Sequence, residues 1–249
     1  MNTSTLPLTG KIAIVTGGSR SIGAAIAKRL AADGATVAIT YNASPDRAAA
    51  VVQEIVAAGG QAVALAADAG NPEAVRAAIA EVAQRFGKID ILVNNAGISL
   101  LGAPEDIVFE DFQRILAVNV TGVFVATQQA LKHMGQGGRI IHIGSSMVQY
   151  AAFATASVYT LSKGALTGFS RGLVRDLGPR GTVNTVHPGP TDSDMNPADG
   201  PIADFLRPNI AMGRYGEGKD VASAVAYLAS AEAGFVTGAE LIVDGGFTA

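Results

Sequence analysis

The chain alternates between short, continuously apolar segments and longer alanine-rich segments in which apolar residues recur with helical periodicity. The short segments are rich in β-branched residues and predict strands, whereas the longer segments predict helices. The predicted strands cover residues 11–16, 36–41, 61–67, 89–94, 138–144, 182–186 and 240–244. The predicted helices cover residues 21–33, 44–58, 71–86, 108–134, 157–178 and 219–230.

The strand segments lack alternating polar positions, which is typical of strands buried on both faces of a parallel sheet. Strands joined by helices of this length imply right-handed crossovers. Asn71 followed by Pro72 predicts a helix start, and Gly34 and Gly59 predict helix ends. We therefore expect an α/β protein with a doubly wound, Rossmann-like fold: a seven-stranded parallel sheet with helices on both faces. No linker or change in composition divides the chain, so residues 1–249 are predicted to form a single domain.

The composition narrows the classes of function. Of 249 residues, 49% are hydrophobic and 16% charged, which is typical of a globular core. The net charge of −3 argues against nucleic acid as a partner, and the apolar runs are too short to cross a membrane. No signal peptide is apparent, so a cytoplasmic location is expected. The absence of cysteine and the isolated positions of His133, His142 and His187 predict no metal site.

Ligands of such sheets bind at the carboxyl ends of the strands. The first predicted strand is followed by the glycine-rich sequence TGGSRSIG, residues 16–23, which enters a helix. Free N–H groups at a helix N-terminus bind a pyrophosphate well. Ser21 occupies the position where a dinucleotide motif usually has its middle glycine, and a positive φ there would carry strain. The segment alone is a weak signal, since glycine turns after strands are common.

The end of the second strand distinguishes between nicotinamide cofactors. An acidic residue there would bind the ribose 2′-hydroxyl of NAD, whereas a basic residue nearby suits the 2′-phosphate of NADP. The sequence is Tyr41-Asn42-Ala43-Ser44, with no acid before Asp46. Arg20 in the glycine turn can reach the same region, so NADP(H) is expected; alternatively, Arg20 is a solvated loop cation.

Polar residues also follow the third and fourth strands. Asp68 could accept a hydrogen bond from an adenine amino group or cap a local turn. Asn94 and Asn95 could join strands internally, and Gly97 would allow the backbone to approach the cofactor closely.

Tyr159 and Lys163 form a candidate proton-transfer pair. Residues four apart lie on one helix face, and a nearby ammonium group is expected to lower the phenol pKa. Tyr215 and Lys219 have the same spacing, but two glycines lie between them and no strand end precedes them. The spacing by itself is therefore only moderately specific.

Two further groups could assist Tyr159. Ser145 or Ser146, at the end of the fifth strand, could polarise a carbonyl oxygen. Asn119, a polar residue in an apolar helix segment, could hold a water near Lys163 or be a satisfied buried amide.

As a set, residues 16–23, 94–97, Asn119, Ser145, 159–163 and Pro188-Gly189 resemble the short-chain dehydrogenase/reductase family of the single-domain type, in order and spacing and through nearly the whole chain. The resemblance implies hydride transfer between a nicotinamide and a carbonyl or alcohol carbon.

Asn119, Ser145, Tyr159 and Lys163 would be the catalytic residues, with Ser145 preferred to Ser146 because it directly follows the strand end. The resemblance also implies that the segment 187–193 binds the nicotinamide carboxamide and that the protein is a homotetramer built through the helices 108–134 and 157–178. The expected cofactor-binding residues are Gly17, Ser19, Arg20, Ser21, Ile22, Gly23, Tyr41, Asn42, Ala43, Ser44, Asp68, Ala69, Asn95, Ala96, Gly97, Tyr159, Lys163, Pro188, Gly189, Thr191 and Ser193.

The sequence therefore favours an NADPH-dependent carbonyl reductase similar to 3-oxoacyl-thioester and polyhydroxynaphthalene reductases, acting on a small-molecule carbonyl or alcohol. An NAD(P)-binding epimerase or dehydratase, and a catalytically silent nucleotide-sensing regulator, are the alternatives. An enoyl reductase is disfavoured, because its lysine is spaced farther from the tyrosine and Leu166 stands seven residues after Tyr159. The segment 191–216 is expected to be a substrate loop, in which Phe205, Leu206, Ile210 and Met212 suggest a partly apolar substrate.

Overall fold

The computed structural model describes residues 6–249 and contains a seven-stranded parallel sheet. The strands lie in the order β3-β2-β1-β4-β5-β6-β7. Strands β1 to β3 follow one another toward one edge of the sheet and strands β4 to β7 toward the other, so the strand order switches between β1 and β4. The strands are β1 Ile12–Val15, β2 Thr36–Tyr41, β3 Gln61–Ala66, β4 Ile91–Asn94, β5 Gly138–Ile143, β6 Gly181–Pro188 and β7 Glu240–Val243. The expected α/β fold is confirmed, and the strand bounds agree with the predicted ones to within two residues.

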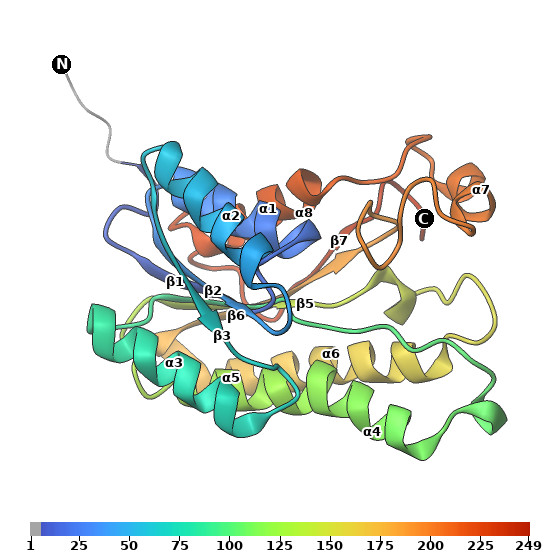
Figure 1. The fold of residues 1–249 in the computed structure, drawn as a ribbon, viewed down its shortest axis with the longest axis horizontal. Helices are drawn as coiled ribbons and strands as arrows, with labels where there is room; N and C mark the ends of the chain where they lie inside the picture. The colour runs from blue at the N-terminus through green and yellow to red at the C-terminus, as the bar shows by residue number, and fades with distance from the viewer. Residues whose placement is uncertain (1–5) are drawn as a thin grey trace.

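Helices cover both faces of this sheet (Figure 1). α1, α2 and α8 lie on one face, while α3, α4, α5 and α6 lie on the other. The helices are α1 Ser21–Ala32, α2 Pro45–Ala57, α3 Pro72–Phe86, α4 Phe109–Leu116, α5 Gly122–Ala130, α6 Ser157–Leu177, α7 Ala203–Leu206 and α8 Gly218–Ala229.

The two faces bury separate apolar clusters. Ile26 and Leu30 of α1 pack with Val221 and Val225 of α8 on one side, where α1 and α8 are in extensive contact. Ile79 and Val82 of α3 pack with residues of β1 and β4 on the other. The central strands β1 and β4 are therefore buried along their whole length, which explains their unbroken apolar sequences.

The predicted helix boundaries have local causes. The Asn71 side chain accepts hydrogen bonds from the N–H groups of Glu73 and Ala74, at 3.0 and 3.1 Å, and so caps α3. Gly34 and Gly59 have φ values of 102° and 86° just after α1 and α2, a conformation that glycine adopts without strain.

The helix predicted for residues 108–134 is not continuous. A π-helical turn, Ala117–Thr121, separates α4 from α5, and the helical segment ends at Ala130. Such turns insert an extra residue and are frequent at functional sites. The segment 191–216 was expected only as a loop, yet it contains α7 and a 3₁₀ turn, Arg207–Asn209.

Candidate active site

The glycine turn after β1 is shaped by contacts with the start of the β4–α4 connection. Gly17 has a φ of 65°, and a Cβ at this position would lie 2.9 Å from the Cα of Ala96. A Cβ at Gly23 would lie 2.3 Å from the Gly17 carbonyl oxygen. The Asn95 side chain donates to the carbonyl oxygens of Thr16 and Gly17, at 2.9 and 3.1 Å. Asn95, which follows β4, thus binds the turn that follows β1, as expected. These contacts fix the backbone of the turn at the N-terminus of α1.

Ser21 has a φ of 47°, so its backbone takes the conformation expected of the glycine it replaces. Its hydroxyl is hydrogen-bonded to Asp194 of the 191–216 segment. Asp194 also forms ion pairs with Arg20, at 3.1 Å, and with Arg47 of α2. The hydrogen bond from Arg47 is the largest influence that holds the pKa of Asp194 below its usual value. Sequence reasoning missed Arg47, although its place in the first turn of the helix after β2 was a usable signal.

Asp68 lies at the end of β3 and is bound within the protein. Its carboxylate accepts hydrogen bonds from the Gly70 N–H and from Arg114, both at 2.9 Å. The hydrogen bond from Arg114 is the main cause that lowers the Asp68 pKa. Asp68 thus caps the local turn. Arg114, which sequence reasoning had not singled out, lines the cleft beside Asp68.

Tyr159, Ser145 and Lys163 come together between the end of β5 and the first turns of α6. The Ser145 hydroxyl interacts with the Tyr159 phenol, while Ser146 is 2% exposed and begins a 3₁₀ turn. Lys163 is 5% exposed, and its ammonium group donates to the Ile143 carbonyl oxygen at 2.9 Å. This geometry supports the preference for Ser145 over Ser146.

The pKa of Tyr159 differs in direction from the sequence prediction. Burial raises the pKa of this phenol above its usual value, and only the hydrogen bond from Ser145 acts to lower it. Burial also lowers the pKa of Lys163 to about 8. The expected depression of the Tyr159 pKa by Lys163 is therefore wrong, because desolvation of the phenolate is the dominant influence on this group.

Asn119 lies on the π-helical turn and is 1% exposed. Its amide oxygen accepts from the Ile98 N–H, and its amide nitrogen donates to the Ile98 carbonyl oxygen, each at 2.9 Å. The nitrogen also donates to the Ser162 hydroxyl at 3.0 Å. A Cβ on Gly97 would lie 3.0 Å from the Lys163 nitrogen and 3.4 Å from the Asn119 oxygen, so these two groups flank the same glycine. Asn119 is a satisfied buried amide next to the Lys163 region, and it does not line the cleft.

A cleft of about 450 Å³ runs along the carboxyl ends of the strands. All of the expected cofactor-binding residues line it, from Gly17 to Ser193, and Ser145 lines it as well. Asn119 is the one catalytic candidate that lies behind its wall. The cleft thus joins the glycine turn, the ends of β2 and β3, and the Tyr159 region in one continuous space.

The end of the cleft beyond Tyr159 has an apolar wall. Of the four apolar residues expected to face a substrate, Leu206 lines the cleft; Phe205 and Met212 are exposed, and Ile210 is buried in a cluster with Phe247. Three of the four therefore do not line the cleft, and the inference of a partly apolar substrate does not rest on them. Met195 and Ile202 of the expected substrate loop also line the cleft, and further large apolar residues come from segments that sequence reasoning had not assigned to a substrate: Leu101, Met147, Phe153 and Phe247.

The second tyrosine–lysine pair is not a site. Tyr215 is buried, its hydroxyl lies 3.5 Å from Asn196, and Arg207 packs over its ring. It does not line the cleft, and Lys219 pairs with Glu217 on the surface. Within residues 6–249, no group of three metal-ligating side chains is arranged to hold a metal ion. Over the same residues, no helix is both long and apolar enough to span a membrane.

Comparison with known proteins identifies the family. Residues 17–248 match a family model described as Enoyl-(Acyl carrier protein) reductase. The Cyclic-di-GMP-binding biofilm dispersal mediator protein of Escherichia coli is 43% identical over 242 residues, which are 97% of this chain and 98% of that protein. Versicolorin reductase 1 of Aspergillus parasiticus is 39% identical over 253 residues, covering 96% of this chain and 97% of that one.

Solved structures agree with these sequence relatives. A short-chain dehydrogenase from Burkholderia cenocepacia, determined in complex with NADP, has a TM-score of 0.95 and 54% identity, and the match covers 98% of this chain and 100% of that chain. The chain therefore belongs to the short-chain dehydrogenase/reductase family, a class of oxidoreductases, as its motifs predicted.

Proposed function

We propose that the protein is an NADPH-dependent carbonyl reductase. The observation that carries this proposal is that Ser145, Tyr159 and Lys163 line the same part of one cleft, where the Lys163 ammonium group is buried and donates to the Ile143 carbonyl oxygen. A substrate carbonyl oxygen placed between the two hydroxyls would receive two hydrogen bonds where negative charge develops.

The residues of the cleft fit NADP(H). The glycine turn is a cradle that a Cβ at Gly17 or Gly23 would fill, and it opens at a helix N-terminus suited to a pyrophosphate. Arg20 and Arg47 already hold one carboxylate between them, so they can hold the 2′-phosphate in its place. NADP in the Burkholderia cenocepacia relative supports the same cofactor. When bound, NADPH supplies the hydride for the carbonyl carbon.

The chain's own residues supply the proton and the electrostatics. Tyr159 donates its proton to the substrate oxygen, and Ser145 donates a hydrogen bond that orients this oxygen. A raised pKa keeps the Tyr159 phenol protonated at neutral pH, which suits an acid in the reductive direction. Lys163 would hold the nicotinamide ribose, and Asn119 fixes the backbone at Ile98.

The substrate class follows from the far end of the cleft. Leu101, Met147, Phe153, Ile202 and Phe247 line the space beyond Tyr159, so a ketone with an apolar body fits this end. The proposal is tested by following NADPH oxidation against ketones, quinones and 3-oxoacyl thioesters. Turnover that depends on Tyr159 with at least one apolar carbonyl is expected; no turnover across the panel would overturn the proposal.

A nucleotide-sensing regulator is the second candidate, because a relative of similar length is named as a cyclic-di-GMP-binding mediator. The same panel separates the two. A regulator would bind nucleotide without turning over any carbonyl, whereas a reductase oxidises NADPH.

We also propose a cytoplasmic homotetramer built through α4, α5 and α6. Phe109, Phe124 and Leu161 on these helices are 63%, 48% and 53% exposed in the single chain and would be covered in such an assembly. Light scattering after size exclusion would show four chains, and a monomer would contradict the proposal.

A further inference from the structure

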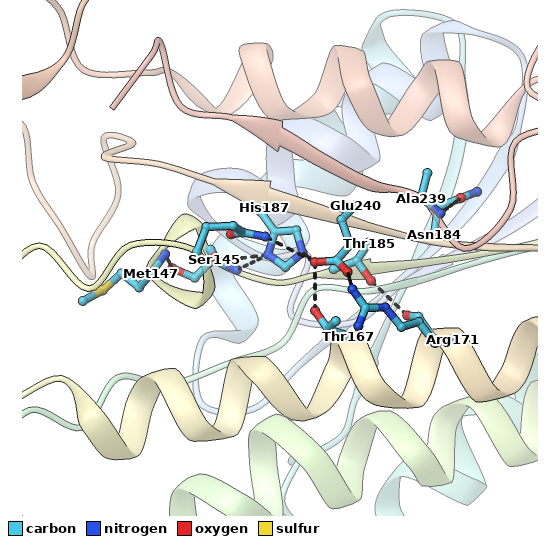
Figure 2. A network of polar contacts seen from close by, with 11 residues as sticks. Ser145, Met147, Thr167, Arg171, Asn184, Thr185, His187, Ala239 and Glu240 are labelled. Atoms are coloured by element: carbon cyan, nitrogen blue, oxygen red, sulfur yellow. Dashed lines mark hydrogen bonds and ion pairs between the residues drawn. The ribbon is translucent and has the colours of Figure 1, made fainter. Parts of the chain in front are cut away.

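His187 of β6 connects the main chain of Ser145 to a carboxylate on β7 (Figure 2). The imidazole is fully buried, and its Nδ1 lies 3.2 Å from the Ser145 nitrogen and 2.9 Å from the Ser145 carbonyl oxygen. Its Nε2 lies 3.4 Å from Oε2 of Glu240. One ring therefore touches the peptide groups of a candidate catalytic residue on one side and an acid on the other.

Glu240 is held in place by side chains of α6 and the β5–α6 connection. Arg171 forms an ion pair with its Oε1 at 2.6 Å. The Thr167 hydroxyl and the Gln149 amide donate to its Oε2, at 3.3 and 3.2 Å. These donors fix the carboxylate opposite His187, and Figure 2 shows it between the His187 ring and Thr167 and Arg171.

The carboxylate determines which ring nitrogen carries the proton. A carboxylate can only accept hydrogen bonds, so Nε2 must carry hydrogen to interact favourably with Glu240. Burial is the largest influence on the His187 pKa and lowers it, which leaves the ring neutral with one proton. With that proton on Nε2, Nδ1 is an acceptor and receives the N–H of Ser145 at 3.2 Å, whereas in the other tautomer Nδ1 would donate to the Ser145 carbonyl oxygen at 2.9 Å.

The backbone around the ring is built for this contact. A Cβ on Gly144 would lie 2.6 Å from Nδ1 of His187, so only glycine before Ser145 lets the ring approach. The absence of a side chain at Gly144 therefore brings the imidazole against the Ser145 peptide groups.

We propose that His187, oriented by Glu240, is a positioning residue that fixes the Ser145 main chain so that the Ser145 hydroxyl faces Tyr159. The consequence for turnover rests on the proposed reductase function, whereas the tautomer of His187 does not. The two are therefore tested separately.

The tautomer is measured by ¹⁵N NMR of the full-length protein labelled at histidine. The chain has three histidines, and the signals of His187 are those absent from His187→Gln. We expect a protonated Nε2 and an unprotonated Nδ1 in the wild type and in Glu240→Gln, which keeps an acceptor. Glu240→Leu removes the acceptor and should move the proton to Nδ1, toward the Ser145 carbonyl oxygen. A proton on Nδ1 in the wild type, or no change in Glu240→Leu, would overturn the proposal.

The kinetic test uses two substitutions of His187, one that can still contact Ser145 and one that can still contact Glu240. Asparagine places an amide oxygen near the position of Nδ1 and can still accept from Ser145, whereas glutamine reaches toward Glu240 and cannot. We expect kcat to fall roughly 10- to 100-fold in His187→Gln and by only a few-fold in His187→Asn, with the Kd for NADPH unchanged in both.

Thr185→Val is the matched control in the same strand, because Thr185 pairs with the Ser170 hydroxyl and does not touch Ser145. It should lower stability and leave kcat nearly unchanged. Equal losses of kcat in the two His187 variants would overturn the positioning role.

If the wild type reduces no carbonyl, the reductase proposal fails, and the NMR result still decides how His187 holds Ser145. If the His187 variants do not fold, the Glu240→Gln and Glu240→Leu pair supplies the kinetic comparison, with the loss of kcat expected in the leucine variant alone.

Discussion

Ser21 and Asp194 stand 173 residues apart in the sequence and hydrogen-bond each other twice. The Ser21 hydroxyl donates to the Asp194 carboxylate and accepts from the Asp194 main-chain N–H, both at 3.2 Å. The residue that replaces the usual glycine of the turn thus fastens the 191–216 segment over the start of α1.

Substituting Ser21 separates its backbone conformation from its hydrogen bonds. Ser21→Gly and Ser21→Ala both lose the side-chain contacts with Asp194, but the positive φ at this position strains only alanine. We expect the glycine variant to be more stable than the alanine variant by about 1–2 kcal/mol in urea unfolding. Ser223, exposed on α8, is the control, and there alanine should be more stable than glycine by about 1 kcal/mol. Equal stability of the two Ser21 variants would show that the turn carries no strain.

Arg20 and Arg47 should set the preference for NADPH over NADH. Because both arginines already bind a carboxylate at the expected 2′-phosphate position, Arg20→Ala should weaken NADPH binding roughly 10- to 100-fold and leave NADH binding nearly unchanged. Fluorescence titration measures both affinities. Arg29→Ala is the control, since Arg29 pairs with Asp33 away from the cleft. Tighter binding of NADH than NADPH by the wild type would contradict this assignment.

Tyr159→Phe should abolish carbonyl reduction. Removing a general acid costs roughly 10²- to 10⁴-fold in kcat, while the Kd for NADPH should change little because the ring remains in place. Steady-state kinetics with the best substrate of the panel, together with NADPH titration, provide the measurement. Turnover close to that of the wild type would exclude Tyr159 as the acid.

Ser145→Ala and Ser146→Ala compare two neighbouring hydroxyls. Only Ser145 interacts with the Tyr159 phenol, so its substitution should lower kcat at least tenfold more than that of Ser146. The two variants are to be measured at saturating NADPH. The opposite order would move the oxygen-binding role to Ser146.

Lys163 should make stability rise with pH above about 8 in the protein without cofactor. Burial lowers its pKa from 10.5 to about 8, so between these values the unfolded chain binds a proton that the folded protein does not. Stability then increases by up to roughly 1.4 kcal/mol per pH unit across this window, and below it Lys163 contributes no pH dependence. Urea unfolding at pH 7 and pH 9 measures the rise. In Lys163→Met the part due to this group should disappear; an identical rise in both proteins would disprove it.

Much of the fold was predictable because its causes are local. Apolar strands such as β1 and caps such as Asn71 depend on short stretches of sequence. The π-helical turn at Ala117–Thr121 was not predictable, because the apolar pattern of residues 108–134 is compatible with one continuous helix. The short helix α7 was missed for a similar reason, since proline and glycine around it are typical of a loop.

The site was predictable where it lies in motifs and less so where it depends on packing. Ser145 follows a strand end and Tyr159 lies at the start of a helix, both of which the sequence reveals, and both residues line the same cleft. The direction of the Tyr159 pKa depends on how deeply the phenol is buried, which spacing does not encode. The roles of Arg47 and His187 depend on partners more than 40 residues away in the chain, Asp194 and Ser145.

The π-helical turn has a consequence for any redesign of this protein. It accommodates an additional residue between α4 and α5, so deletion of a single residue from 117–121 would yield a regular and locally more favourable helix. In that regular helix α4 and α5 would keep their relative orientation, but the bulged backbone that brings Asn119 to Ile98 would be lost. A change that makes the helix more regular would therefore remove the contacts of Asn119 next to Lys163. The length of this segment thus matters for function as much as its composition.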